Sequence, residues 1–256
     1  FSEIGQLAGI AKTDWSWAPL IADFDNDGFN DVFITNGIQN DLSNQDFRNQ
    51  MRENIRNRKK VSLEQAINMM PSHTLSNYIF KNNQDLTFKN TSKDWGLSAK
   101  INSNGAVYAD LDNDGDLDLI VNNQVEEASI YKNNSTKNYV DIILQGSAKN
   151  TFGIGATISV FSEGLQQSKQ HFVSRGFQSS VSNKLHFGLG NKTKIDSVLV
   201  DWKHGKSQKI LNPEINSTVK ITFKNADSNT KLQNSITPLF EQVNPSEIGI
   251  HYRQKQ

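Results

Sequence analysis

Two short acidic segments have the residue types and spacing to bind a metal ion. Each follows the nine-residue pattern D-x-D-x-D-G-x-x-D, with Gly28 or Gly115 at the sixth position. Their aspartates are Asp23, Asp25, Asp27 and Asp31 in the first segment, and Asp110, Asp112, Asp114, Asp116 and Asp118 in the second. Two carboxylates about 4 Å apart repel by roughly 4 kcal/mol at an effective dielectric constant near 20. Segments this acidic therefore predict a bound cation.

The ligand chemistry indicates which cation it is. Alternate aspartates in a tight loop converge on one centre, and the glycine permits the turn that brings the ninth residue round. An all-oxygen, carboxylate-rich site suits Ca²⁺, whereas Mg²⁺ dehydrates reluctantly and Zn²⁺ prefers His or Cys. We therefore predict two calcium sites. The alternative of plain Asp-rich turns does not explain two gap-free copies of the pattern.

Two other calcium motifs fit less well. An EF-hand needs a bidentate Glu at position twelve, where this chain has Ile34 and Val121. Thrombospondin-type calcium repeats share the nine-residue spacing, but they are stapled by cysteines, and this chain has none. The segments on either side are also rich in strand-forming residues.

The acidic segments belong to an internal repeat. Sliding the chain by 87 residues lays the first segment on the second without a gap, and Phe1, Gly9 and Ala22 fall on Phe88, Gly96 and Ala109. A short apolar strand follows each segment, and then a matching run, 79–83 or 130–134. The first copy carries 36 extra residues between segment and run, so the bare unit has 51 residues. That length suits one propeller blade.

The extra residues, about 40–73, are the only stretch with helical periodicity. Apolar residues recur there at intervals of three and four, Ser62 and Gln65 are spaced as a capping box, and Pro71 ends the pattern. We expect a helical hairpin. Its basic residues fit a solvated helix face, and we assign them no function.

Composition excludes several classes of protein. The 256 residues include 27 Lys and Arg against 27 Asp and Glu, so the net charge is zero and a general attraction to nucleic acid has no support. Hydrophobic residues make up 36%, and no apolar run approaches the roughly 18 residues of a transmembrane helix. The chain starts at Phe1 without a signal segment, so we expect a processed or excised piece of a longer protein.

The chain divides into four parts. Residues 1–137 form two blades with the helical insertion, 138–223 form a separate β domain, 224–239 form a polar linker, and 240–256 start a further repeat at Phe240. Within the β domain, strands are predicted at 139–144, 156–161, 169–173, 197–202 and 218–223.

The stretches WSWAPLIADFDNDGFNDVFITNG and SNGAVYADLDNDGDLDLIVNN resemble FG-GAP/VCBS repeats, the calcium-loop blades also found in integrin α-subunit propellers. The resemblance implies carboxylate ligands at positions one, three, five and nine and a main-chain carbonyl at position seven. That carbonyl belongs to Phe29 in the first loop and to Asp116 in the second, so Asp116 would bind through its backbone alone.

The stretches GIGATISVFSEG, RGFQSSVSNKLHFGLG and VLVDWKHGKSQKIL resemble the ASPIC/UnbV domain of bacterial surface proteins and of the cartilage acidic protein family. Lys203 departs from that pattern, which more often has Pro after the Trp. The implied fold is all-β: a partial β-propeller with a helical insertion, followed by a β-sandwich-like ASPIC/UnbV domain.

The expected function is that of a calcium-stabilised, non-catalytic binding or adhesion scaffold. We expect it in the extracellular space or at the bacterial outer-membrane surface, as a lipoprotein or secreted protein. Its expected partners are a protein or glycan ligand at the cell surface and other outer-membrane proteins. The alternative is an accessory subunit or an enzyme acting on polysaccharide.

Other residues suggest sharper functions that the sequence does not support. Gly153-Ile154-Gly155 lacks the third glycine and the βαβ context of a dinucleotide loop. The histidines His171, His186 and His204 lack metal-ligand spacing, and we expect His186 to be a hydrogen-bonded packing residue. The tryptophans Trp15 and Trp17 are expected to fill a seam between blades.

Overall fold

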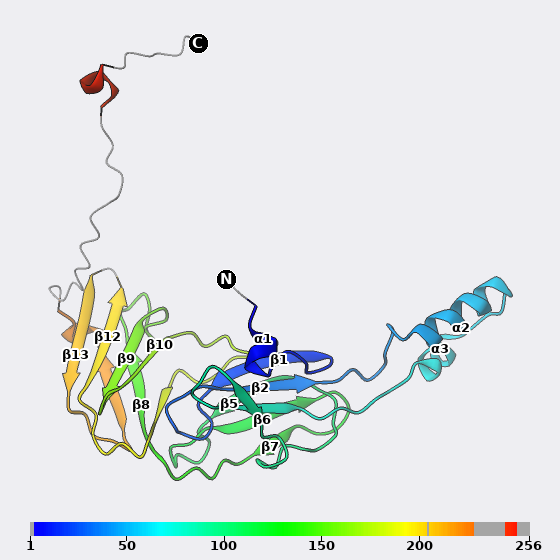
Figure 1. Ribbon diagram of the computed structural model, residues 1–256, viewed down its shortest axis with the longest axis horizontal. Helices are drawn as coiled ribbons and strands as arrows, with labels where there is room; N and C mark the ends of the chain where they lie inside the picture. The colour runs from blue at the N-terminus through cyan, green and yellow to red at the C-terminus, as the bar shows by residue number, and fades with distance from the viewer. Residues whose placement is uncertain (1–2, 204, 228–243, 250–256) are drawn as a thin grey trace.

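The computed structural model describes residues 3–203, 205–227 and 244–249. In the described part strands far outnumber helices and form four sheets with no closed barrel (Figure 1). This confirms the predicted all-β class. Within these residues, no helix combines the length and the hydropathy needed to cross a lipid bilayer.

The first two sheets are the two repeats. Each is an antiparallel meander in which consecutive strands pair. A short helix, α1 (Gly5–Ala8), precedes them. The first sheet contains β1 (Ser16–Ala22), β2 (Asp31–Asn36), β3 (Tyr78–Asn82) and β4 (Phe88–Asn90). The second contains β5 (Ser103–Ala109), β6 (Asp118–Asn123) and β7 (Ser129–Tyr131).

The two blades share one hydrophobic core. Alternate residues of the inner strands point into it, as the twofold periodicity of a strand requires. Leu20 and Phe33 from the first blade and Leu119 and Val121 from the second are all buried in the same cluster. The blades are therefore packed face to face, and the loops between their first two strands lie at neighbouring positions.

The helical insertion forms as predicted. It consists of α2 (Gln45–Arg56) and α3 (Leu63–Met69). The Ser62 hydroxyl accepts a hydrogen bond from the Gln65 amide, and the Gln65 side chain accepts one from the Ser62 amide, which completes the capping box. Figure 1 shows this hairpin extending away from the blades, on the side opposite the C-terminal sheets.

The C-terminal region is a sandwich of two sheets. One has the order β10-β9-β12-β13, and the other has β11-β8-β14. The strands are β8 (Asn138–Gln145), β9 (Thr157–Ser162), β10 (Leu165–Gln170), β11 (Leu185–Gly190), β12 (Ser197–Lys203), β13 (Lys206–Leu211) and β14 (Thr218–Thr222). Both sheets contribute to one core, in which Ile142, Ile158, Phe187 and Val200 are fully buried.

The structure differs from the sequence expectations at several places. The strand expected at 169–173 ends at Gln170, and β11 and β13 were not predicted. The polar linker begins later than residue 224, because Phe223–Asn225 forms a 3-10 turn (η1) and Asp227 pairs with Ser207. Residues 228–239 lie outside the described residues, as does most of the further repeat expected at 240–256. The 3-10 turn η2 (Pro245–Ile248) lies within it.

The prediction that the two tryptophans fill a seam between blades is wrong. Trp17 packs against Phe177 of the C-terminal region, with ring centroids 5.0 Å apart, and its indole N–H donates to the Gly37 carbonyl at 2.7 Å. The Trp15 side chain precedes β1 and is 42% exposed. Trp17 therefore joins the first blade to the C-terminal domain.

Candidate metal centre

The acidic loops connect the first two strands of each blade. The first lies between β1 and β2, and the second lies between β5 and β6. Each loop brings together three carboxylates whose oxygens lie within 4.8 Å of one another. These groups are Asp23, Asp25 and Asp27 in the first loop, and Asp110, Asp112 and Asp118 in the second.

The backbone of each loop curls around these carboxylates. The sixth-position glycines have positive φ angles, 95° for Gly28 and 89° for Gly115, which other residues rarely adopt. The Gly28 amide donates to Asp23 Oδ2 at 2.7 Å, and the Asp27 amide donates to Asp23 Oδ1 at 3.0 Å. In the second loop the Asp114 amide donates to Asp110 Oδ1 at 3.1 Å. The first aspartate thus organises each turn.

The ninth aspartate ties each loop to the third strand of its blade. Asp31 accepts hydrogen bonds from the Phe24 amide at 3.1 Å and the Asn82 amide at 2.9 Å. Asp118 accepts equivalent bonds from Leu111 at 2.8 Å and Asn133 at 2.9 Å. Asp31 does not join the three converging carboxylates of its loop, whereas Asp118 does. Each carboxylate oxygen has a second lone pair that remains able to bind a metal.

The seventh position differs between the loops. Phe29 has no carboxylate, and its amide donates to Asp27 Oδ1 at 3.0 Å. The Asp116 side chain is buried, with Oδ2 accepting from the Ser135 amide at 2.8 Å and Oδ1 without a hydrogen-bond partner. Burial raises the pKa of Asp116 to about 7. One oxygen of this side chain thus bonds to Ser135, and the expectation that Asp116 binds a metal through its main chain alone stays a prediction.

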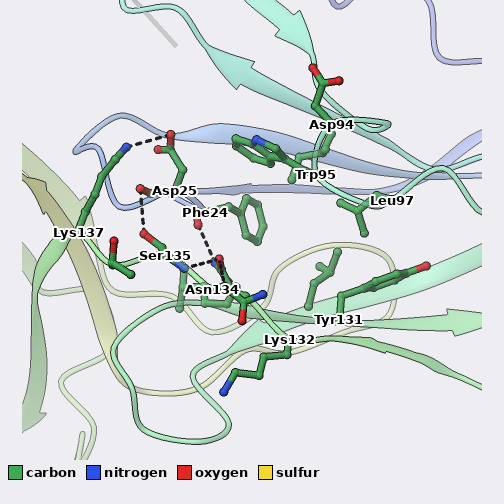
Figure 2. Close-up of a pocket in the computed structure, with 15 residues that line it drawn as sticks. Phe24, Asp25, Asp94, Trp95, Leu97, Tyr131, Lys132, Asn134, Ser135 and Lys137 are labelled. Atoms are coloured by element: carbon green, nitrogen blue, oxygen red, sulfur yellow. Dashed lines mark hydrogen bonds and ion pairs between the residues drawn. The ribbon is translucent and has the colours of Figure 1, made fainter.

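Lysines occupy the positions where a cation would neutralise the loops. The Lys81 ammonium pairs with Asp25 and also lies 2.9 Å from Asp27 Oδ2. Its repeat equivalent, Lys132, pairs with Asp112 in the second loop. Lys137 also contacts Asp25 Oδ2, at 3.1 Å (Figure 2). Lys81 thus bridges two of the three converging aspartates of the first loop, which shows that these oxygens can hold a positive charge.

The proton affinities of the first loop show how it is balanced. Burial raises the pKa of Asp23 to about 6 and that of Asp31 to about 7. Burial also acts to raise the pKa of Asp25, but hydrogen bonds from Lys81 and Lys137 outweigh it, so this pKa lies below its ordinary value. The two most deeply buried carboxyls of the loop, Asp23 and Asp31, therefore have too little positive charge nearby, among the described side chains, to offset their burial.

The C-terminal domain packs directly on the first loop. The His186 ring lies between Asp141 and the loop residue Asn26, with Nδ1 2.9 Å from Asp141 Oδ1 and Nε2 2.7 Å from Asn26 Oδ1. The Gly190 amide donates to the Asn26 carbonyl at 2.7 Å. A Cβ on Gly188 would lie 2.1 Å from Asp23 Oδ2, so this position accepts only glycine without a shift. The prediction of a hydrogen-bonded packing role for His186 is confirmed.

The same domain also contacts the second loop. The Lys184 ammonium lies 2.8 Å from Asp110 Oδ2 and 3.1 Å from Asp141 Oδ2. A Cβ on Gly115 would lie 1.9 Å from the Tyr139 ring. The Asn26 side-chain amide donates to the Gly115 carbonyl at 2.9 Å and so joins the two loops. Both candidate metal sites therefore lie at one junction of three structural units.

Comparison with known proteins finds two matching families. Residues 69–121 match the FG-GAP-like repeat, and residues 146–228 match the family described as ASPIC and UnbV. The chain is an FG-GAP repeat protein with an ASPIC/UnbV domain. The FG-GAP match includes the second acidic loop, and the internal repeat extends the same pattern to the first. No curated protein matches the chain.

The FG-GAP assignment supports part of the expected setting. FG-GAP repeats typically occur in extracellular or surface proteins, and they are known to bind calcium. This chain has two acidic clusters with the composition to hold a metal ion, one in each loop.

Sequence reasoning missed the residues that surround the loops. Lys81 and Lys132 occupy the same place in the two Ile-x-Lys-Asn-Asn runs, so the repeat could have indicated them. For His186 and Lys184 there was no such signal, because their partners in the blades are 160 and 74 residues away along the chain.

Proposed function

We propose that the chain is a calcium-stabilised, non-catalytic scaffold that presents its ASPIC/UnbV domain and loops to a partner outside the cell. The observation that supports this is the convergence of three carboxylates in each of two repeat-equivalent loops. The residues that would hold calcium are Asp23, Asp25, Asp27, Asp31 and the Phe29 carbonyl, and Asp110, Asp112, Asp114, Asp118 and the Asp116 carbonyl. Bound calcium supplies positive charge that neutralises the carboxylates.

The location of the loops gives that charge a structural role. Each loop is packed on the ASPIC/UnbV domain, through His186 in one case and Lys184 in the other. An ion that fixes the loops would therefore fix the angle between blades and domain. Binding to the folded state alone stabilises it by RT ln(1 + [Ca²⁺]/Kd).

A non-catalytic role is favoured by where the perturbed carboxyls lie. Among the described residues, the aspartates with pKa raised to about 6 or 7 are Asp23, Asp31 and Asp116, and all three belong to the acidic loops. A glycosidase would need such a carboxyl facing a substrate cleft. We propose that its ligand is a protein or glycan at the cell surface. We also propose that the full-length bacterial protein is either attached to the surface by a lipid anchor or secreted.

Thermal unfolding in calcium and in chelator tests the metal proposal. Extracellular calcium modules have Kd values on the order of 10⁻⁴–10⁻³ M. Two sites at ten times Kd would add about 2.8 kcal/mol. For a chain of this size that free energy corresponds to a rise in melting temperature of roughly 6–11 °C. Equal melting temperatures in 5 mM calcium and in EDTA would contradict the proposal.

Matched variants locate the sites. Asp112→Asn should weaken calcium binding at the second loop in isothermal titration calorimetry, because the amide removes a charge from the converging oxygens. Asp94→Asn is the control, since the Asp94 side chain is 64% exposed and its nearest cation, Lys89, is 3.9 Å away. Equal calcium binding by the two variants would exclude the second loop as a site.

A glycan array and a polysaccharide depolymerisation assay separate scaffold from enzyme. We expect binding without cleavage by the purified chain. Cleavage without a second protein would establish the enzyme alternative.

A further inference from the structure

The second blade offers an open strand edge. In the first blade β3 pairs with β4, which begins at Phe88. In the second blade the order ends at β7, and no strand among the described residues pairs with its outer edge. Instead of turning back as a hairpin, the chain continues from Tyr131 toward the ASPIC/UnbV domain. The unpaired edge leaves backbone N–H and C=O groups available to another strand.

A cavity of about 530 Å³ lies beside this edge (Figure 2). One part of its wall is apolar and includes the aromatic residues Phe24, Trp95 and Tyr131. Leu97 and Leu119 extend the apolar lining. The rest of the lining is polar or charged: Asp25, Asp94, Lys132, Asn133, Asn134, Ser135, Thr136 and Lys137. The apolar part of the cavity is wide enough to take a large apolar side chain.

The first blade has an equivalent cleft. Three of its lining residues, Ala8, Ile10 and Asn82, are the repeat equivalents of residues that line the cavity beside β7. Those equivalents are Trp95, Leu97 and Asn133, in the same order. Phe88 of β4 is part of the wall in the first blade. The cavity beside β7 has no counterpart of Phe88 among the described residues.

The repeat-equivalent glycines Gly9 and Gly96 show the same difference between the two blade edges. A Cβ added to Gly9 would lie 3.0 Å from the Phe88 carbonyl oxygen. A Cβ added to its repeat equivalent, Gly96, would meet no atom within 4 Å. The space beside Gly96 is therefore open where the corresponding space beside Gly9 holds β4.

We propose that the outer edge of β7 accepts a Phe-led strand from another FG-GAP repeat, with the phenylalanine seated in the cavity of about 530 Å³. The occupant is specified by β4: an extended segment of the type Phe-x-Asn that pairs antiparallel. In the first blade Phe80 pairs with Asn90 and Asn82 with Phe88. Tyr131 is the repeat equivalent of Phe80, so the same register would place Tyr131 opposite the asparagine of the added strand. The pairing edge itself, Ser129–Tyr131, contains none of the proposed calcium ligands, although Asp25 of the first acidic loop lines the cavity.

Disulfide trapping tests the register, because the chain contains no cysteine. The probe is a synthetic peptide of residues 86–97 that carries an activated cysteine at position 91. It is added to the full 256-residue chain with Ile130→Cys. Position 91 lies opposite position 79 in the first blade, where the Thr91 amide donates to the Ile79 carbonyl at 2.9 Å, and Ile130 is the repeat equivalent of Ile79.

We expect efficient labelling by this peptide in both calcium and chelator. A peptide with the cysteine at position 92 should label at least tenfold more slowly, because neighbouring strand residues point to opposite faces. A peptide with Phe88→Ser should need about tenfold or higher concentration, because it loses the burial of the aromatic ring. Labelling that ignores register or the phenylalanine would overturn the proposal.

Two further outcomes would assign the edge to a different occupant. A dimer of the unmodified chain that the peptide dissociates in size-exclusion chromatography would assign the edge to a second copy. Faster labelling after Phe240→Ser would assign it to the chain's own third Phe-led segment. Either result would overturn the assignment to another repeat.

Discussion

Replacement of Asn26 by glycine tests whether the loops and the ASPIC/UnbV domain stabilise each other. Asn26 is buried, has a φ of 55°, and bonds to both His186 and the Gly115 carbonyl. Its repeat equivalent, Asn113, has a φ of 60° but is exposed, and no side-chain hydrogen bond of Asn113 is found among the described residues. The pair therefore differs in contacts but not in backbone conformation.

The magnitude follows from the two buried hydrogen bonds. Glycine adopts positive φ without strain, so Asn113→Gly should change the free energy of unfolding by less than about 0.5 kcal/mol. Asn26→Gly leaves a buried carbonyl and a buried imidazole nitrogen unpaired, and each such group costs about 1–3 kcal/mol. We therefore expect Asn26→Gly to destabilise by roughly 2–6 kcal/mol, or by about 4 °C or more in melting temperature.

Thermal and urea unfolding of both variants in saturating calcium measures this difference. Far-ultraviolet circular dichroism reports the loss of strands, and tryptophan fluorescence follows Trp17 at the domain junction and Trp202 in the sandwich core. If the two variants lose stability equally, the contact through Asn26 does not stabilise the junction, and the coupling of loops to domain is refuted.

Three further perturbations have expected outcomes. In chelator, the melting temperature should fall as the pH rises from 5 to 7.5, because the folded chain keeps protons on the three carboxyls with pKa raised to about 6 or 7, whereas the unfolded chain loses them near pH 4. Saturating calcium should remove this fall, and a fall that persists in calcium would contradict the metal assignment. Gly188→Ala should destabilise the chain by about 1–3 kcal/mol in urea unfolding, because the new Cβ meets Asp23 at 2.1 Å and the loop backbone at 2.5 Å. Gly105→Ala, whose new Cβ has its nearest atom at 3.2 Å, should cost less, and the reverse order would refute the close packing of β11 on the first loop. Trp17→Phe should cost about 1 kcal/mol through its lost indole hydrogen bond, and the exposed Trp15→Phe should be neutral in the same assay; equal costs would exclude a special role for Trp17.

The turns of the acidic loops and the repeat could be recognised in the sequence because both are patterns of fixed spacing. Gly28 and Gly115 have the positive φ angles that the pattern requires. The helical insertion was predictable for the same reason, since Ser62 and Gln65 cap α3 through contacts only three residues apart.

Features that depend on distant contacts were missed. Strand β11 alternates Leu185, Phe187 and Leu189 toward the sandwich core with His186 and Gly188 toward the first acidic loop. The apolar residues of this strand alternate with a histidine and two glycines, and because glycine is depleted in strands this alternation did not indicate one. The lysines beside the loops were missed because their charge compensation appears only once the third strand of each blade lies next to its loop.

Lys81 and Lys132 give the chain built-in counter-ions. The chain itself therefore balances part of the charge of its acidic turns before any ion binds. If calcium binds as proposed, an ion that displaces Lys132 would add one net positive charge to the second loop instead of two. The displaced ammonium would stay tethered beside the loop and change the charge of that surface.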